Sequence, residues 1–161
     1  CIKQLNGQKA FLLVDKNKSQ NGNPIFISES DIENVITAKA AIFAAMKILL
    51  SRLEVSFNDI SRFYIAGAFG IHIDIENAIT IGLIPDIKRE KIIFSGNTSI
   101  KGAKLAAYFK DAFYKITMIR ERTTYYDLMG APDYVDEFRK AMFLPHTDIE
   151  LFRSVKKWQR A

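Results

Sequence analysis

The residues with the clearest potential for chemistry are glycines that follow an apolar strand, in the sequence FYIAGAFG over residues 63–70. Glycine has no Cβ, so the backbone of such a turn can approach a ligand closely. In open α/β sheets, ligands bind beyond the carboxyl ends of the strands, which is where this turn stands. The G-x-x-G spacing alone is also typical of a plain tight turn. The segment is therefore a candidate ligand site that needs support from its surroundings.

A second glycine turn gives some of that support. The apolar run Ile92–Phe94 is followed by Gly96 and Asn97. Two such turns at the ends of neighbouring strands favour a ligand crevice more than either turn alone. Lys39 is a further candidate, since it stands among alanines in a helical segment. Its amine could contact a ligand, or its stem could lie along the helix surface, and both readings stay open.

The remaining polar residues predict structural roles. His72 and His146 lie far apart and have no partner at metal-ligand spacing, so we expect structural or surface roles for both. No grouping of Ser, His and Asp predicts a nucleophilic triad. We expect Asp15, Asp74 and Glu76 in turns and helix caps. The sequence accordingly predicts no catalytic residue and no metal ligand.

Antiparallel strands are predicted at the start of the chain. Asn6-Gly7, a strong hairpin signal, separates Ile2–Leu5 from Lys9–Val14, and a third short strand is expected at Pro24–Ile27. Neither the first strand nor the strand at residues 63–66 contains an acid. Clustered carboxylates on strands of this kind hold the metal ions of many nucleases, so their absence argues against nuclease chemistry.

A long helix is predicted from Asp31 to Leu53. Ser30 and Glu33 have the S-x-x-E spacing of a capping box, and apolar residues recur at helical spacing after them. The middle of the helix, around Lys39, is rich in alanine. We therefore expect another element to pack closely against it.

Strands and helices alternate through the rest of the chain. The predicted elements are the buried strand Phe63–Ala66, a helix from Asp74 to about Ile81, the strand Lys91–Phe94, the helices Ser99–Phe109 and Asp111–Arg120, the strand Thr123–Leu128 and the helix Asp133–Met142. This order suits an α/β fold of the ribonuclease-H-like type, with a mixed sheet and helices on both faces. We expect one such domain over residues 1–142 and an irregular C-terminal tail over residues 143–161.

Phenylalanines fall mostly on the predicted apolar faces, so we expect them in the core. The set comprises Phe11, Phe26, Phe43, Phe63, Phe94, Phe109 and Phe113.

Composition is that of an ordinary globular domain. The chain has 161 residues, of which 48% are hydrophobic and 25% charged, with a net charge of +5. We interpret that charge as a solvated basic surface rather than a nucleic-acid site.

Cys1 is the single cysteine, which excludes an internal disulfide and a four-cysteine iron–sulfur cluster. We read Cys1 as a residue at the edge of a fragment. No apolar run approaches the roughly 20 residues that span a membrane, and a cytoplasmic location is expected.

Four blocks of the sequence resemble, in the same order, the C-terminal region of reductive activators of corrinoid-dependent enzymes. The blocks are DIENVITAKAAIFAAMKILL, FYIAGAFGIHIDIENAITIGLIPD, FSGNTSIKGAKLA and MFLPHTDIELF. The resemblance covers residues 25 to about 155. It implies one ribonuclease-H-like half-domain of the superfamily of actin, sugar kinases and heat-shock chaperones (ASKHA), which bind ATP in a cleft between two such halves.

The resemblance also implies a function for the parent protein. Such activators use ATP and Mg²⁺ to return an inactive Co(II) corrinoid protein to Co(I), and they carry a [2Fe–2S] cluster in a separate ferredoxin domain. It implies a corrinoid protein as partner and a homodimer, with no membrane and no nucleic acid. The residues that match the nucleotide-binding positions of the family are Gly67, Ala68, Phe69, Gly70, Lys39, Gly96 and Asn97.

The sequence departs from the full family pattern in what it lacks. Neither a four-cysteine motif nor the phosphate-clamping half-domain is visible. We therefore expect the chain alone to reduce nothing and to bind ATP at most weakly. Two alternatives stay open: a module of the same fold that docks on a corrinoid protein or forms a dimer, and an activator of an acyl-CoA dehydratase. The absence of a cluster cysteine beside the nucleotide region counts against the second. A nucleic-acid binder is supported by charge alone.

Overall fold

The computed structural model describes residues 2–5, 7–128 and 130–156, so Cys1 lies outside the described residues. The chain begins with three antiparallel strands, β1 (Ile2–Leu5), β2 (Gln8–Val14) and β3 (Ile25–Ser28). Leu5 lies opposite Gln8 across the first turn, which confirms the predicted hairpin. Gly7 in that turn has φ of 82°, a conformation that glycine adopts without strain.

The long helix α1 (Glu29–Arg52) follows directly. Its cap is Ser28, whose side chain accepts a hydrogen bond from the Asp31 amide, while the Asp31 carboxylate accepts one from the Ser28 amide. The capping box predicted at Ser30 and Glu33 is therefore wrong by two residues. Both pairs have the same spacing, and the strand that ends at Ser28 decides which one is used.

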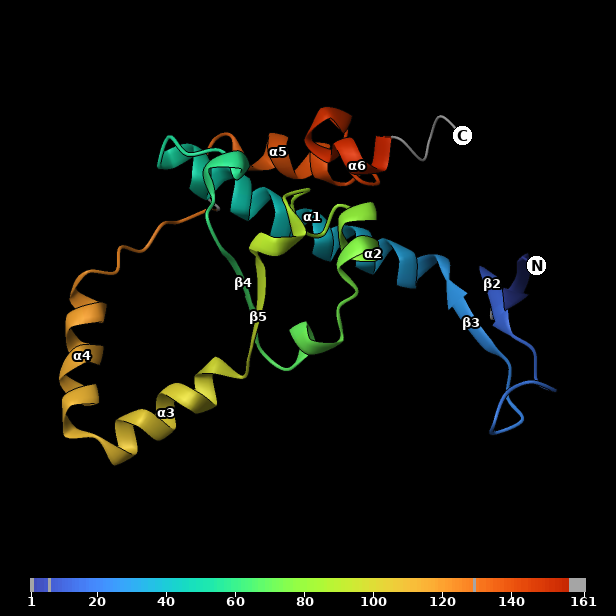
Figure 1. Cartoon of the computed structure of the whole chain (residues 1–161). Coiled ribbons are helices and arrows are strands. Elements are labelled where there is room, and N and C mark those ends of the chain that lie inside the picture. The colour runs from blue at the N-terminus through green and yellow to red at the C-terminus, as the bar shows by residue number, and fades with distance from the viewer. Residues whose placement is uncertain (1, 6, 129, 157–161) are drawn as a thin grey trace.

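The second sheet contains two parallel strands, β4 (Phe63–Ala66) and β5 (Ile92–Gly96). It is separate from the first sheet, so the expectation of one mixed sheet is wrong for the described strands. The reason is visible in Figure 1: the antiparallel strands lie at the amino end of α1, whereas β4 and β5 extend away from its other half. A helix of 24 residues is about 36 Å long, far beyond the spacing of paired strands. β4 is also only half-buried, not the buried strand expected.

Five shorter α-helices follow within the described residues: α2 (Ile75–Thr80), α3 (Thr98–Tyr108), α4 (Lys110–Glu121), α5 (Tyr134–Ala141) and α6 (Arg153–Lys156). The first four agree with the predicted helices. The predicted strand Thr123–Leu128 is wrong, because residues 123–127 have no regular structure. Tyr125 there is 85% exposed, and a strand needs a neighbour to accept its backbone hydrogen bonds.

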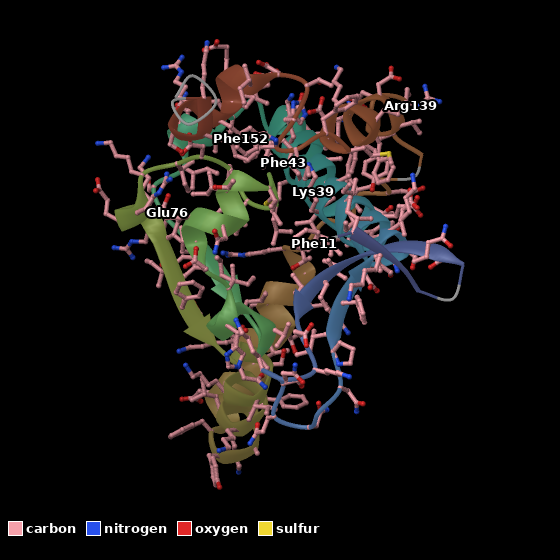
Figure 2. The ribbon with its side chains drawn as sticks, turned by 90° about the vertical axis from the view of Figure 1, so that its right-hand side faces the viewer. Phe11, Lys39, Phe43, Glu76, Arg139 and Phe152 are labelled. Atoms are coloured by element: carbon pink, nitrogen blue, oxygen red, sulfur yellow. The ribbon has the colours of Figure 1, made fainter. Side chains whose placement is uncertain are left out.

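The core lies between α1, α2, α5 and the C-terminal segment, defined as residues 143–156 (Figure 1). Phe43 of α1 and Phe152 lie near each other in Figure 2. Their ring centroids are 5.3 Å apart, and both side chains are fully buried. Phe152 ends a short 3-10 helix, Ile149–Phe152, that leads into α6. The expectation of an irregular tail over residues 143–161 is therefore wrong for residues 149–156, and residues 157–161 lie outside the described residues. The sequence did contain the signal, since the apolar residues of this segment recur at helical spacing.

The phenylalanines divide into three groups, of which one, Phe26 and Phe63, is half-buried. Phe43 is buried, as predicted. The core placement expected for four others is wrong, because Phe11, Phe94, Phe109 and Phe113 are 44–67% exposed. Phe109 joins α3 to α4, and Phe113 belongs to α4. These two helices extend away from the rest of the fold in Figure 1.

By length and composition, α1 is the one described helix that could cross a membrane. This corrects the expectation that no segment is apolar enough to do so. Its contacts are those of a core helix, since Ala40, Phe43, Ala44 and Ile48 are buried against other elements. It also carries Lys39 in its middle, and that lysine is fully buried by protein.

Candidate functional site

The two glycine turns, residues 67–70 and 96–97, meet at one edge of the second sheet, which we call the glycine edge. β4 and β5 run parallel with Ala66 opposite Gly96, so their carboxyl ends coincide. The Gly67 N–H donates a hydrogen bond of 2.9 Å to the Gly96 carbonyl oxygen. The structure thus joins the two turns that the sequence placed at neighbouring strand ends, and it does so through the backbone.

Gly67 is the residue of this edge with open space beside it. Its φ is +98°, in the region that favours glycine, and a Cβ built there would meet nothing within 4 Å. Ala68 beside it is exposed. The absence of a side chain at Gly67 therefore leaves the backbone accessible to a ligand. Protein packing does not demand a glycine at this position.

Gly70 has a different role. A Cβ at Gly70 would stand 2.6 Å from the Ile65 Cγ2 atom, closer than side chains approach one another. The turn folds back on its own strand here, and the glycine permits that contact. Phe69 begins the short 3-10 helix Phe69–His72, but its side chain is outside what the structure describes. The G-x-x-G motif thus contains two glycines with different roles. Gly67 leaves open space beside the backbone, and Gly70 allows close packing against Ile65.

Asn97 caps helix α3. Its Oδ1 atom accepts a hydrogen bond of 3.1 Å from the Ile100 amide, which orients the helix with its positive end at the glycine edge. Lys101, one turn later, donates a 2.9 Å hydrogen bond to the Ser95 carbonyl oxygen. Its amine stands 3.7 Å from the position of a Cβ on Gly96. Sequence reasoning missed Lys101, although a lysine in the first turn after a strand–glycine–helix junction is a recognisable signal.

Lys39 lies elsewhere. Its side chain is buried, and its amine donates hydrogen bonds to the carbonyl oxygens of Phe143 and, at 2.7 Å, Pro145. Burial lowers the pKa of Lys39 to about 8. The surface position considered for Lys39 is therefore wrong, and its described partners belong to the C-terminal segment. A nucleotide contact by Lys39 stays a prediction.

A buried polar group lies beside Lys39. His146 contacts Glu137 of α5 at 3.1 Å, and Lys47 of α1 pairs with the same carboxylate at 2.6 Å. The His146 Nδ1 atom accepts a hydrogen bond from the Asp148 amide, so its Nε2–H donates to Glu137 and the ring is neutral. Burial lowers the pKa of His146, and the Glu137 carboxylate offsets part of that effect. The expected structural role of His146 is confirmed, and His72 is exposed.

The acidic side chains near the turns also form hydrogen bonds or ion pairs. Asp74 caps α2 by accepting a 2.8 Å hydrogen bond from the Asn77 amide, as predicted, and Asp15 accepts a turn hydrogen bond from the Asn17 amide. Glu76 is not a cap: it pairs with Arg89 at 2.7 Å. Within the described part of the chain, no three His, Cys, Asp or Glu residues gather in a way that could hold a metal ion.

Neither of two hollows in the described part of the chain coincides with the glycine edge, and the larger, of about 650 Å³, is lined by residues of the first sheet and the start of α1. A cavity of about 480 Å³ lies between the carboxyl end of α1, residues 56–58 and the C-terminal segment, and the residues that line it include neither glycine turn. The glycine edge is thus an open wall. A ligand held there needs a second surface to enclose it.

The chain matches a protein family over residues 1–156, described as the C-terminal domain of RACo, the ASKHA domain. The chain belongs to this family. The match places the two sheets and the core of α1, α2 and α5 within an ASKHA-type α/β fold. It confirms the resemblance seen in the four sequence blocks.

Individual relatives agree. The chain is 32% identical over 133 residues, 83% of its length, to the corrinoid activation enzyme RamQ of Eubacterium limosum. It is 32% identical over 68% of its length to the [Co(II) methylated amine-specific corrinoid protein] reductase of Methanosarcina barkeri. A solved structure, the reductive activator for corrinoid, iron–sulfur protein, superposes with a TM-score of 0.88 at 42% identity over 96% of the chain.

The chain spans only part of each relative. It covers 22% of RamQ, 20% of the reductase and 24% of the chain with known structure.

Proposed function

We propose that this domain supplies one wall of the ATP site in a reductive activator that returns a Co(II) corrinoid protein to Co(I). The observation that carries the proposal is the glycine edge, where the Gly67 N–H is hydrogen-bonded to the Gly96 carbonyl oxygen and open space lies beside Gly67. The relatives named as corrinoid activators and reductases support the choice of reaction.

The residues present fit a nucleotide as a binding wall. The bare backbone at Gly67 allows a flat base or a ribose to lie against it without a side-chain clash. The positive end of α3 and the amine of Lys101 give the same edge a positive character that suits a phosphorylated ligand. When bound, ATP supplies the free energy that favours one conformation of the activator over another. The residues of this chain bind and orient the nucleotide, and we assign none of them a catalytic step.

The iron–sulfur cluster does not fit this chain. Four cysteine ligands are the rule for a [2Fe–2S] centre, and the chain has a single cysteine. We therefore place electron transfer in another part of the parent protein, together with the surface that holds the phosphates and Mg²⁺.

The test is a pair of glycine substitutions in the full-length protein. Gly67→Val puts a branched side chain into the open space at the proposed wall. Gly22→Val is the matched control, because Gly22 also has a positive φ, of 70°, and empty space beside it, but lies in the loop of the first sheet. Both variants place a branched side chain at a positive φ, which strains the backbone.

We expect Gly67→Val to weaken Mg-ATP binding in calorimetric titration by about tenfold or more, equivalent to about 1.4 kcal/mol. ATP-dependent Co(I) formation, followed by the corrinoid absorbance, should fall with it. Gly22→Val should leave both unchanged. Equal ATP affinity in the two variants would contradict the proposed wall. Lost folding in both would be visible in the circular dichroism of the control.

A further inference from the structure

Lys39 is enclosed where three parts of the fold meet. It lies in the middle of α1 and is 1% exposed. Its amine donates hydrogen bonds to the carbonyl oxygens of Phe143 and Pro145, which belong to the C-terminal segment. The Pro145 carbonyl in turn lies directly against Gly82, two residues after the end of α2. One carbonyl group therefore joins α1, the end of α2 and the C-terminal segment.

The contact at Gly82 leaves no room for a side chain. A Cβ built there would overlap the Pro145 carbonyl oxygen and would lie 2.8 Å from the carbonyl carbon, closer than Cβ atoms approach. Gly82 also has φ of +78°, in the region that favours glycine. Its N–H donates to the Ile79 carbonyl oxygen at 2.9 Å, which ties this position to the last turn of α2. The position of Pro145 therefore fixes the end of α2.

Helix α2 connects this contact to the glycine edge. Asp74 caps the helix, four residues after Gly70. The 3-10 helix Phe69–His72 between the turn and the cap packs against both β4 and β5, and Gly70 is in close contact with Ile65. The chain from the glycine turn to α2 is thus packed or capped along its length. A shift of α2 therefore displaces the turn.

A second contact ties the same region to the C-terminal segment. The Asp86 Oδ2 atom accepts a 2.7 Å hydrogen bond from the Ser154 amide, and the Oδ1 atom pairs with Arg89 at 2.7 Å. Arg89 also pairs with Glu76 of α2 at 2.7 Å. The chain after α2 is thus held on the C-terminal segment at two points, the first of them at Gly82.

A lysine at position 39 costs more free energy than an apolar side chain of the same length. Burial lowers the pKa of Lys39 to about 8, so the amine still carries a charge at neutral pH. A methionine would fill the same space without removing a charge from water. Methionine has no donor, however, and cannot hold two carbonyl oxygens in place. Buried polar groups that are fully hydrogen-bonded specify one arrangement of a core, and this is what the lysine adds.

We propose that Lys39 is a positioning residue for the glycine edge and does not contact the nucleotide. Its amine holds the Pro145 carbonyl, Pro145 holds Gly82, and α2 carries that position to the turn at Gly67. The link to nucleotide binding rests on the proposed function, whereas the series of contacts rests on the described residues alone. The lysine thus sets the geometry of the nucleotide wall without touching the ligand.

The first variant of the full-length protein removes the amine. Lys39→Met keeps the length of the side chain but leaves the Pro145 carbonyl without its donor. Lys47→Met is the matched control, because Lys47 also lies on α1 and pairs with Glu137 at 2.6 Å, away from Pro145. Both variants remove a lysine with a defined partner from the same helix.

The second variant disturbs the same contact from the side of α2. Gly82→Ala places a methyl group against the Pro145 carbonyl. Gly22→Ala is its matched control, because Gly22 has a similar positive φ, of 70°, and empty space beside it. The two alanine variants therefore share the backbone strain, and only the first has the clash.

Calorimetric titration gives the Mg-ATP affinity of each folded variant, and hydrogen–deuterium exchange without nucleotide gives the local opening of residues 67–82. We expect Lys39→Met and Gly82→Ala each to weaken Mg-ATP binding by about fivefold or more, the lower end of the usual coupling between separate sites. Exchange over residues 67–82 should rise in both. The double variant should bind no more weakly than the weaker single variant, because both changes act on one carbonyl. The two controls should keep the wild-type affinity and the wild-type exchange over residues 67–82.

Unchanged Mg-ATP affinity in folded Lys39→Met would overturn the positioning role. A loss of affinity in Lys39→Met with Gly82→Ala like the wild type would also overturn it, because the amine would then contact the nucleotide directly. Should Gly82→Ala not fold, the exchange of Lys39→Met makes the same distinction, since a direct contact predicts no rise without nucleotide. An equal loss of affinity in Lys47→Met would trace the effect to general stability and contradict the proposal.

The proposed function is tested separately by the wild type. A wild type that binds no Mg-ATP would overturn the nucleotide wall. The exchange over residues 67–82 would then decide by itself whether Lys39 holds the glycine edge, with a rise in Lys39→Met supporting that role and no rise overturning it.

Discussion

At the residue scale, the two glycines of the G-x-x-G motif have different structural roles. Gly67 leaves open space at the glycine edge, whereas Gly70 permits a close contact with Ile65. The sequence predicted the turn but could not separate these roles, because the backbone conformation and the neighbouring side chain decide them. Lys39 shows the same limit. Its position among alanines predicted a special environment, but its carbonyl partners come from residues more than a hundred positions away.

His146 allows a pH prediction at this scale. Burial holds its pKa below the ordinary value of 6.5, and its Nδ1 atom accepts a backbone hydrogen bond that a proton would break. The unfolded chain therefore binds a proton before the folded chain does. The stability that His146 contributes is complete above pH 6.5 and is lost as the pH falls through the folded pKa. Chemical denaturation should show a larger loss of stability between pH 7 and pH 5 in the wild type than in His146→Gln. Equal losses would contradict a buried neutral histidine.

At the scale of elements, local sequence predicted most helices and strands to within a few residues. The long helix, the hairpin and the strand–glycine–helix junctions carry strong local signals, namely periodicity, caps and glycine turns. The strand expected at Thr123–Leu128 failed because its β-forming residues have no neighbouring strand. The arrangement of two separate sheets was also beyond local signals, since it depends on which strands come within hydrogen-bonding distance.

The start of α1 provides a prediction for an element. Ser28 holds both hydrogen bonds of the capping box with Asp31, while Ser30 lies inside the helix. Ser28→Ala should lower the free energy of unfolding by about 1 kcal/mol, the usual effect of losing a cap. Ser30→Ala should cost less, because it removes no cap, only contacts to Ser28 and Gln8. Denaturant unfolding of the two variants decides which serine begins the helix. A larger effect at Ser30 would support the position predicted from the sequence.

At the scale of the whole molecule, the chain is a core that carries the glycine edge. The core of α1, α2, α5 and the C-terminal segment holds the glycine edge in place, and α3 and α4 extend from that edge. Composition could predict a basic surface but not that α3 and α4 concentrate it, because that requires their path. The phenylalanines of residues 98–122 looked like core residues for the same reason. Their helical spacing predicts an apolar face and says nothing of what covers it.

The most direct test of the nucleotide wall is a crystal structure of the full-length protein with Mg²⁺ and a non-hydrolysable ATP analogue. We expect the adenosine to lie in van der Waals contact with the Gly67 backbone, at the edge where Gly67 is bonded to Gly96. The phosphates should extend from this edge to a surface supplied by the rest of the protein. A nucleotide bound elsewhere, with the space beside Gly67 filled by protein, would contradict the account.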